Sequence, residues 1–131
     1  MASTNPRPLS PHLTIWRWGP HMVVSILHRV TGVGLTVVGL AVLAWWLAAA
    51  AGGAESYARF TDLMDSPLGL VVLVGLTWAF YQHLLSGLRH LVMDSGAGFE
   101  LSTNKTMAIL TIVGAILLTA LTWAAFKGVF Q

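Results

Sequence analysis

The sequence predicts an all-α integral membrane protein with three transmembrane helices. Of its 131 residues, 56% are hydrophobic and only 9% are charged, whereas a soluble domain carries charge on about a quarter of its residues. Three uncharged apolar stretches, residues 30–54, 66–88 and 106–126, are each long enough to cross a bilayer, which takes roughly 20 residues. Helices are expected because the bilayer core offers no partner for unpaired backbone groups.

The composition also excludes several classes of function. The chain contains no cysteine, so it cannot form a disulfide, a thiolate-ligated iron–sulfur cluster or a cysteine nucleophile. Any cluster chemistry must therefore belong to a partner. The net charge is +2, but the seven lysines and arginines are scattered and mostly flank the apolar stretches. This pattern does not indicate nucleic-acid binding.

The segment before the first span differs in character from the rest of the chain. We expect residues 1–22 to form a cytoplasmic or interfacial segment and residues 23–131 to form the transmembrane anchor domain. Four prolines in the first segment exclude a long helix there, while Trp16 and Trp18 suit the membrane interface or a docked partner. The N-terminus lacks the basic start and short apolar centre of a signal peptide, so we expect the first span to be retained.

The distribution of basic residues predicts the orientation in the membrane. Three arginines precede or begin the first span, and Arg89 and Lys105 flank the second connection. The first connection, expected as a loop over residues 55–65, holds three acidic residues against Arg59 alone. Since Lys and Arg favour the inner side, we expect a cytoplasmic N-terminus and a periplasmic C-terminus. The missing presequence favours a bacterial inner membrane.

His83 is the residue that most strongly suggests a functional site. It is an ionisable group inside the second apolar stretch, where such a group is costly and is a functional-site hypothesis by default. At 3.6 residues per turn, His83, Gly87 and His90 fall on one helix face. That face offers a nitrogen ligand beside a position without a side chain. A histidine that only packs against another helix through a hydrogen bond is the alternative.

Three spans are too few to enclose a large cofactor and still bury their polar faces. The polar side chains gather near one membrane face and do not trace a path across the membrane, which argues against a transporter or channel. We therefore expect a second membrane subunit that packs with this chain as a helical bundle and completes the site.

Three local sequences resemble one known family. The chain contains RPLSPHL at residues 7–13, SILHRVTGV at residues 25–33 and HLLSGLRHLVMD at residues 83–94. In this order and spacing they resemble the cytochrome b membrane-anchor subunit of succinate dehydrogenase, respiratory complex II. The length and the three-helix plan resemble that family as well.

The resemblance implies roles for residues at matching positions. His83 would be an axial ligand of the iron of a b-type haem, and the second axial histidine would come from the other membrane subunit. His28 and Arg29 would lie near the haem propionates, and Ser25 with Arg29 would line the quinone site. The spacing of three and four places Ser25, His28 and Arg29 on one helix face. Alternatively, His28 and Arg29 only reach toward the membrane interface.

Two residues at the membrane edge have less definite roles. His90 would contact a haem propionate or be a plain surface residue. Asp94 would pair with Arg89 or cap the end of the helix.

The resemblance also implies the function and the partners. Succinate would be oxidised in a flavoprotein subunit, and electrons would pass through an iron–sulfur subunit to a quinone, expected to be ubiquinone, at the inner membrane surface. This chain would anchor the complex, supply one haem ligand and form part of the quinone site, and would not carry the succinate-oxidising site. Two alternatives stay open: the anchor of a quinol:fumarate reductase, and a haem-free structural anchor.

Overall fold

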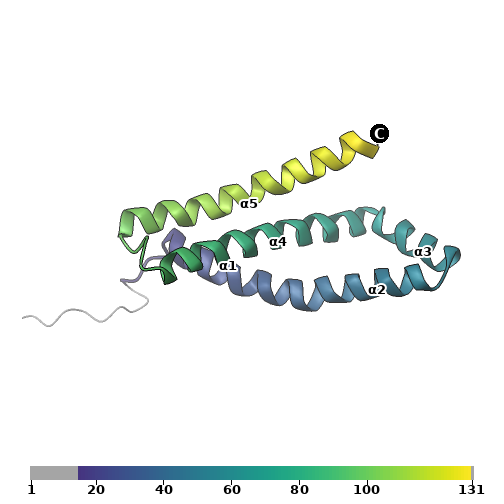
Figure 1. The fold of residues 1–131 in the computed structure, drawn as a ribbon, viewed down its shortest axis with the longest axis horizontal. Helices are drawn as coiled ribbons and strands as arrows, with labels where there is room; N and C mark the ends of the chain where they lie inside the picture. Colours follow the sequence, from purple (N-terminus) through teal and green to yellow (C-terminus); the bar gives the residue numbers. More distant parts are fainter. Residues whose placement is uncertain (1–14, 131) are drawn as a thin grey trace, which may run out of the picture.

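The computed structural model describes residues 15–130, and its regular structure is helical (Figure 1). The elements are α1 (Pro20–Gly34), the π-helical turn η1 (Leu35–Gly39), α2 (Leu40–Ala51), α3 (Ala54–Met64), α4 (Pro67–Asp94) and α5 (Leu101–Phe130). α1, η1 and α2 follow one another without a break and form one long rod. No strand occurs in the described part of the chain, and the all-α prediction is confirmed. The motif at residues 7–13 lies outside it.

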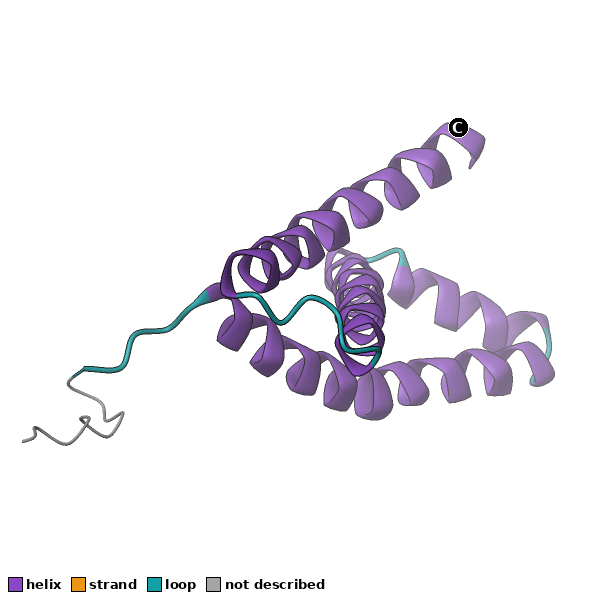
Figure 2. Cartoon of the chain, turned by 60° about the vertical axis from the view of Figure 1, so that its left-hand side comes forward, coloured by secondary structure: helices purple, strands orange, loops and turns teal. Residues whose placement is uncertain are grey.

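α4 is the central helix. It contacts α1, η1, α3 and α5, and Figures 1 and 2 show it between the α1–α2 rod and α5. α1 also contacts α5. The start of α1 and the connection from α4 to α5 lie at one end of the molecule, while α3 and the end of α5 lie at the other (Figure 1). The two ends of the described chain therefore lie at opposite ends of the bundle.

Three helical segments are long and apolar enough to cross a membrane, which confirms the predicted number of spans. They are Pro20–Ala51, Pro67–Asp94 and Leu101–Phe126. The helix that contains the first apolar stretch begins about ten residues before residue 30. Pro20 occupies the first turn, where its missing N–H needs no partner. The division of the chain after residue 22 stays a prediction.

The first connection is a helix and not the loop that we expected. α3 buries Phe60 and Met64, which are four residues apart on one face, against Ala49 of α2. Its exposed face carries an ion pair between Arg59 and Glu55 at 2.5 Å. Charges on one face made the segment look like a loop, but the apolar residues on the other face stabilise a short helix against α2 and α4. The turn into α3 passes through Gly53, whose φ of 87° favours glycine.

The interior of the bundle contains polar as well as apolar side chains, and its outer surface is largely apolar. The largest fully buried side chains include Gln82 and Ser86, whereas large apolar side chains along all three spans are exposed. This distribution is expected in lipid, where apolar surface gains nothing from burial and helices associate through small residues and interhelical hydrogen bonds. The arrangement agrees with a multi-pass membrane protein.

The junction of α3 and α4 depends on Gly69. Ser66 caps α4 by accepting a hydrogen bond from the Gly69 N–H at 3.2 Å, and Gly69 lies directly against the backbone of Leu63 and Met64. We expect Gly69→Ala to lower the stability by about 1–3 kcal/mol, because the new methyl group would overlap that backbone. Thermal unfolding of the detergent-solubilised complex, followed by circular dichroism, measures the change.

Gly75→Ala is the matched control for this prediction. Gly75 lies on the same helix, and a methyl group there would have open space around it. Alanine favours a helix over glycine by about 0.5–1 kcal/mol, so Gly75→Ala is expected to be neutral or stabilising. Equal unfolding temperatures for the two variants would contradict the close contact at Gly69.

Candidate functional site

Two histidines that lie far apart in the sequence stack face to face between α1 and α4. The ring centroids of His28 and His83 are 4.0 Å apart and the ring planes differ by only 8°. His90, two turns after His83 on α4, approaches the His28 ring edge-on at 5.3 Å. The two sequence motifs that carry these residues therefore meet in the structure.

The hydrogen bonding of His83 shows which of its ring nitrogens donates. Its Nδ1 lies 3.1 Å from the backbone carbonyl oxygen of His28 and 3.4 Å from the hydroxyl oxygen of Thr31. A carbonyl oxygen can only accept, so Nδ1 carries the proton and donates it. In a neutral imidazole the other nitrogen, Nε2, then keeps its lone pair. Among residues 15–130, Nε2 has no hydrogen-bond partner.

His83 can pack so close to α1 because Gly32 has no side chain. A Cβ atom at position 32 would lie 2.9 Å from Cε1 of His83, closer than such atoms approach. Beside this contact is an open hollow of about 460 Å³ on the surface of α1, η1 and α4. It is lined by His28, Arg29, Gly32, Val33, Thr36, Val37 and His83. The hollow is bounded by this chain on one side only.

The other predicted site residues take different places around this hollow. Arg29 is exposed and lines it, while His90 is half-buried beside His28. Ser25 is half-buried one turn before Arg29, and its hydroxyl has no hydrogen-bond partner in the described range. The structure thus brings His28, His83 and His90 together directly, and it leaves Ser25 and Arg29 on the adjoining part of α1. In the described part of the chain, no group of three or more His, Asp or Glu side chains is arranged to hold a metal ion.

A second row of polar residues on α4 was not predicted from the sequence. Gln82, Ser86 and Arg89 are buried, and their spacing of four and three places them on one face next to the histidine face. Gln82 Nε2 donates to Ser86 Oγ at 3.1 Å, and Arg89 donates through Nη2 to Asn104 Oδ1 on α5 at 2.7 Å. The recurrence of polar residues at helical spacing in an apolar span was the signal. Arg89 does not pair with Asp94, which had been one of the expected roles for that carboxylate.

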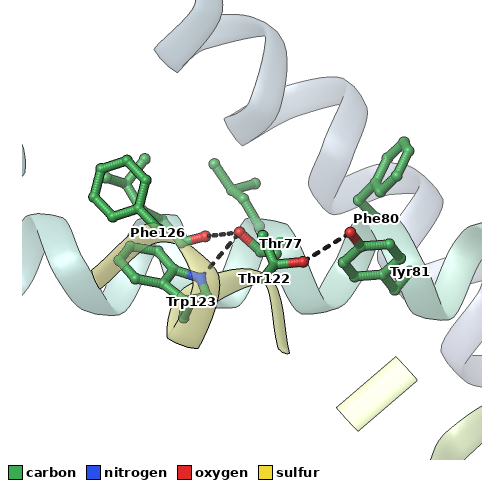
Figure 3. Close-up of a pocket in the computed structure, with 8 residues that line it drawn as sticks. Thr77, Phe80, Tyr81, Thr122, Trp123 and Phe126 are labelled. Carbon is green, nitrogen blue, oxygen red and sulfur yellow. Dashed lines mark hydrogen bonds between the residues drawn. The ribbon is translucent and has the colours of Figure 1, made fainter. Parts of the chain in front are cut away.

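A larger hollow, of about 500 Å³, lies between α4 and α5 and contains none of the predicted site residues (Figure 3). Its polar groups pair with one another: the Tyr81 and Thr122 hydroxyls are 2.8 Å apart, and Trp123 Nε1 donates to Thr77 Oγ1 at 3.4 Å. Size alone therefore does not mark the functional site. The histidine hollow is the better candidate because its imidazole nitrogen is free to bind a ligand.

Comparison with known sequences decides the family. The family "Succinate dehydrogenase/Fumarate reductase transmembrane subunit" matches residues 3–122. The succinate dehydrogenase cytochrome b556 subunit of Paracoccus denitrificans is 39% identical over 120 residues, which are 92% of each chain.

The chain belongs to the succinate dehydrogenase/fumarate reductase transmembrane subunit family. The succinate dehydrogenase cytochrome b556 subunit of Rickettsia conorii is 35% identical, over 91% of this chain and 92% of that protein. The mitochondrial succinate dehydrogenase cytochrome b560 subunit of Sus scrofa is 31% identical, over 88% of this chain and 71% of that protein.

Family membership confirms the resemblance carried by the three sequence motifs. The chain is a cytochrome b membrane subunit of succinate dehydrogenase and works within a complex of several subunits at the membrane. The name cytochrome b implies a haem group. Nε2 of His83, which has no partner in the described range, and the hollow beside it are therefore the part of this subunit to test for haem binding.

The bond between Arg89 and Asn104 is expected to stabilise the contact of α4 with α5. Arg89 is only 6% exposed, and Asn104→Leu removes the acceptor of its guanidinium, so we expect a loss of about 1.5–3 kcal/mol, as for hydrogen bonds to charged groups. Thermal unfolding of the solubilised complex measures it. Asn104→Asp keeps an acceptor oxygen and is the control, and equal destabilisation by Leu and Asp would contradict the assignment.

Proposed function

We propose that this chain supplies one axial ligand of haem b through His83 and part of a quinone-binding site through Ser25 and Arg29, in a complex that transfers electrons from succinate to quinone. Haem bound there would take up and release single electrons beside the quinone, at a potential set by its ligands and its burial. The observation that carries the proposal is the hydrogen bond from Nδ1 of His83 to the His28 carbonyl.

That hydrogen bond fits the chemistry of a haem ligand. A histidine that binds a metal usually donates its other ring N–H to a backbone carbonyl or carboxylate, which fixes the tautomer and the ring orientation. His83 has this arrangement before any ligand is considered. Gly32 keeps the neighbouring backbone uncovered, and the hollow next to it is open for a second polypeptide to close.

A histidine that serves only helix packing would use the same hydrogen bond. Helix packing alone explains the hydrogen bond of Nδ1. It does not explain why Nε2 has no partner among the described residues or why an open hollow adjoins the ring. A single imidazole cannot complete a bis-histidine site, so the second axial histidine is assigned to the second membrane subunit. His28, Arg29 and His90 would contact the haem propionates: His28 stacks on His83, His90 lies against His28, and Arg29 lines the same hollow as His83.

The quinone site is assigned to the part of α1 that precedes the histidine stack. Ser25 has a hydroxyl without a partner in the described range, and Arg29 is exposed and forms no ion pair there. Ser25 would donate a hydrogen bond to a quinone oxygen, ubiquinone being the expected quinone. Arg29 would stabilise the negative charge that develops on that oxygen during reduction, since its guanidinium is always charged.

The remaining parts of the complex are assigned to other chains. A flavoprotein subunit would oxidise succinate, and an iron–sulfur subunit would pass the electrons on, because this chain has no cysteine for a cluster. We assign the chain to a bacterial inner membrane with its N-terminus in the cytoplasm and its C-terminus in the periplasm. The basic residues near the start of α1 and around the α4–α5 connection support this orientation.

Two other functions are separated from this one by simple measurements. A quinol:fumarate reductase anchor would share the same site, and the reaction direction would follow from the membrane quinone and the partner subunits. The names of the three relatives favour succinate dehydrogenase. A haem-free anchor would show no haem absorption in the purified complex.

His83→Ala is expected to abolish the low-spin haem absorption band of the assembled complex, because the ligand nitrogen is removed. The visible spectrum of the reduced purified complex measures it. His83→Asn is the matched variant, since its amide can still donate to the His28 carbonyl and replace the packing contact. A normal haem band in either variant would show that another residue ligates the iron.

Ser25→Ala and Arg29→Leu are each expected to slow succinate-dependent quinone reduction by about tenfold or more, as the loss of a hydrogen bond to a charged group implies. Succinate oxidation by an artificial dye should stay largely unchanged. Arg29→Lys keeps the charge without the guanidinium fork and should be less affected than Arg29→Leu. Parallel loss of both activities would indicate misassembly and would contradict a role in the quinone site.

A further inference from the structure

We propose that Thr31 and Gly32 are positioning residues for the His83 imidazole, Thr31 as a second acceptor for its Nδ1 proton and Gly32 as the uncovered backbone against which the ring lies. This inference rests on the proposed role of His83 as a ligand. It adds two residues of α1 that touch neither the iron nor the quinone in that proposal.

The hydrogen bonds of Thr31 leave its oxygen free to accept. Its hydroxyl lies 2.7 Å from the Leu27 carbonyl oxygen and 3.1 Å from the His28 carbonyl oxygen, so its single proton points to the backbone of α1. The hydroxyl oxygen then has lone pairs that can face Nδ1 of His83 at 3.4 Å. The Nδ1 proton is therefore shared between the His28 carbonyl and Thr31.

Burial makes this second acceptor consequential. Thr31 is only 3% exposed, so water from outside does not replace its hydroxyl when it is removed. Acceptors at Nδ1 draw the proton away from the ring and make the opposite nitrogen a more basic ligand. A more basic ligand favours the ferric over the ferrous state, so the potential of a haem bound to His83 should be lower with Thr31 than without its hydroxyl.

Gly32 acts through shape. An added Cβ would lie 2.9 Å from Cε1 and 3.4 Å from Nδ1 of His83, so both the ring and its hydrogen bond would have to shift. Such overpacking is destabilising because neighbouring groups are forced from their preferred positions. Gly34, two residues further along α1, has nothing within 4 Å of an added Cβ.

The hydroxyl of Thr31 is tested with two variants in the full complex. Thr31→Val removes the hydroxyl and keeps the branched shape, while Thr31→Ser keeps the hydroxyl and removes the methyl group. The haem midpoint potential, from redox titration followed in the visible spectrum, should shift upward in Thr31→Val and stay at the wild-type value in Thr31→Ser. An unchanged potential in Thr31→Val, or equal shifts in both variants, would overturn the role of the hydroxyl.

Gly32 is tested against Gly34 by haem content per complex. Gly32→Ala should lose most of its haem, and Gly34→Ala should retain the wild-type amount. Full haem content with the wild-type potential in Gly32→Ala would overturn the positioning role. The two proposals can fail separately. If His83→Ala keeps its haem, the assignment of His83 as a ligand is wrong. If His83→Ala loses its haem while Thr31→Val and Gly32→Ala behave as the wild type, His83 remains the ligand and only the positioning role of Thr31 and Gly32 is wrong.

Discussion

The hydrogen bond from Nδ1 of His83 to the carbonyl of His28 is the constraint on which the candidate site depends. Within lipid, an imidazole N–H without an acceptor would be costly, and a helix offers few acceptors because its carbonyls are used internally. A carbonyl oxygen has two lone pairs, so that of His28 can accept from His83 while it stays within α1. This bond brings α1 and α4 close enough that Gly32 must lack a side chain, and it leaves the lone pair of the other imidazole nitrogen without a donor among the described residues.

The central helix α4 carries two neighbouring polar rows with different consequences. Gln82 and Arg89 lie in the row that is buried within this chain, where Arg89 binds Asn104 of α5. His83 and His90 lie in the adjoining row, which faces α1 and the open hollow. The first row supplies interhelical hydrogen bonds in a medium without a hydrophobic driving force for helix association. The second row is half-buried and bounded by this chain on one side only, so helix packing and ligand binding are assigned to different faces of one helix.

Much of the fold could be predicted because a bilayer imposes strict requirements on composition. Uncharged length defined the three spans, and the depth of His83 marked the site. The helix ends were less predictable, since Pro20 reads as a helix breaker but fits the first turn, and the charges of α3 concealed the apolar pair Phe60 and Met64. The stacking of His28 on His83 could not be predicted from local patterns, because it depends on the register between two helices that are separated by α3.

Some buried polar atoms of this chain have no hydrogen-bond partner among the described residues. Buried side-chain atoms without a partner in the described range include His28 Nδ1, Gln82 Oε1 and Arg89 Nε. Gln82 and Arg89 each form another hydrogen bond within the bundle, so each side chain has lost only part of its hydrogen bonding. His28 stacks on His83 beside the hollow and has no such second bond through its side chain. Leaving a buried polar atom unpaired costs about 1–3 kcal/mol, and Nδ1 of His28 carries this cost because almost none of its surface is accessible. The hollow of about 460 Å³ is within the size range of ligand sites, roughly 300–1,000 Å³, but it is open on one side. Val33 and Val37, which line it, are exposed and apolar, so in our proposal the missing wall is a helix of the second membrane subunit.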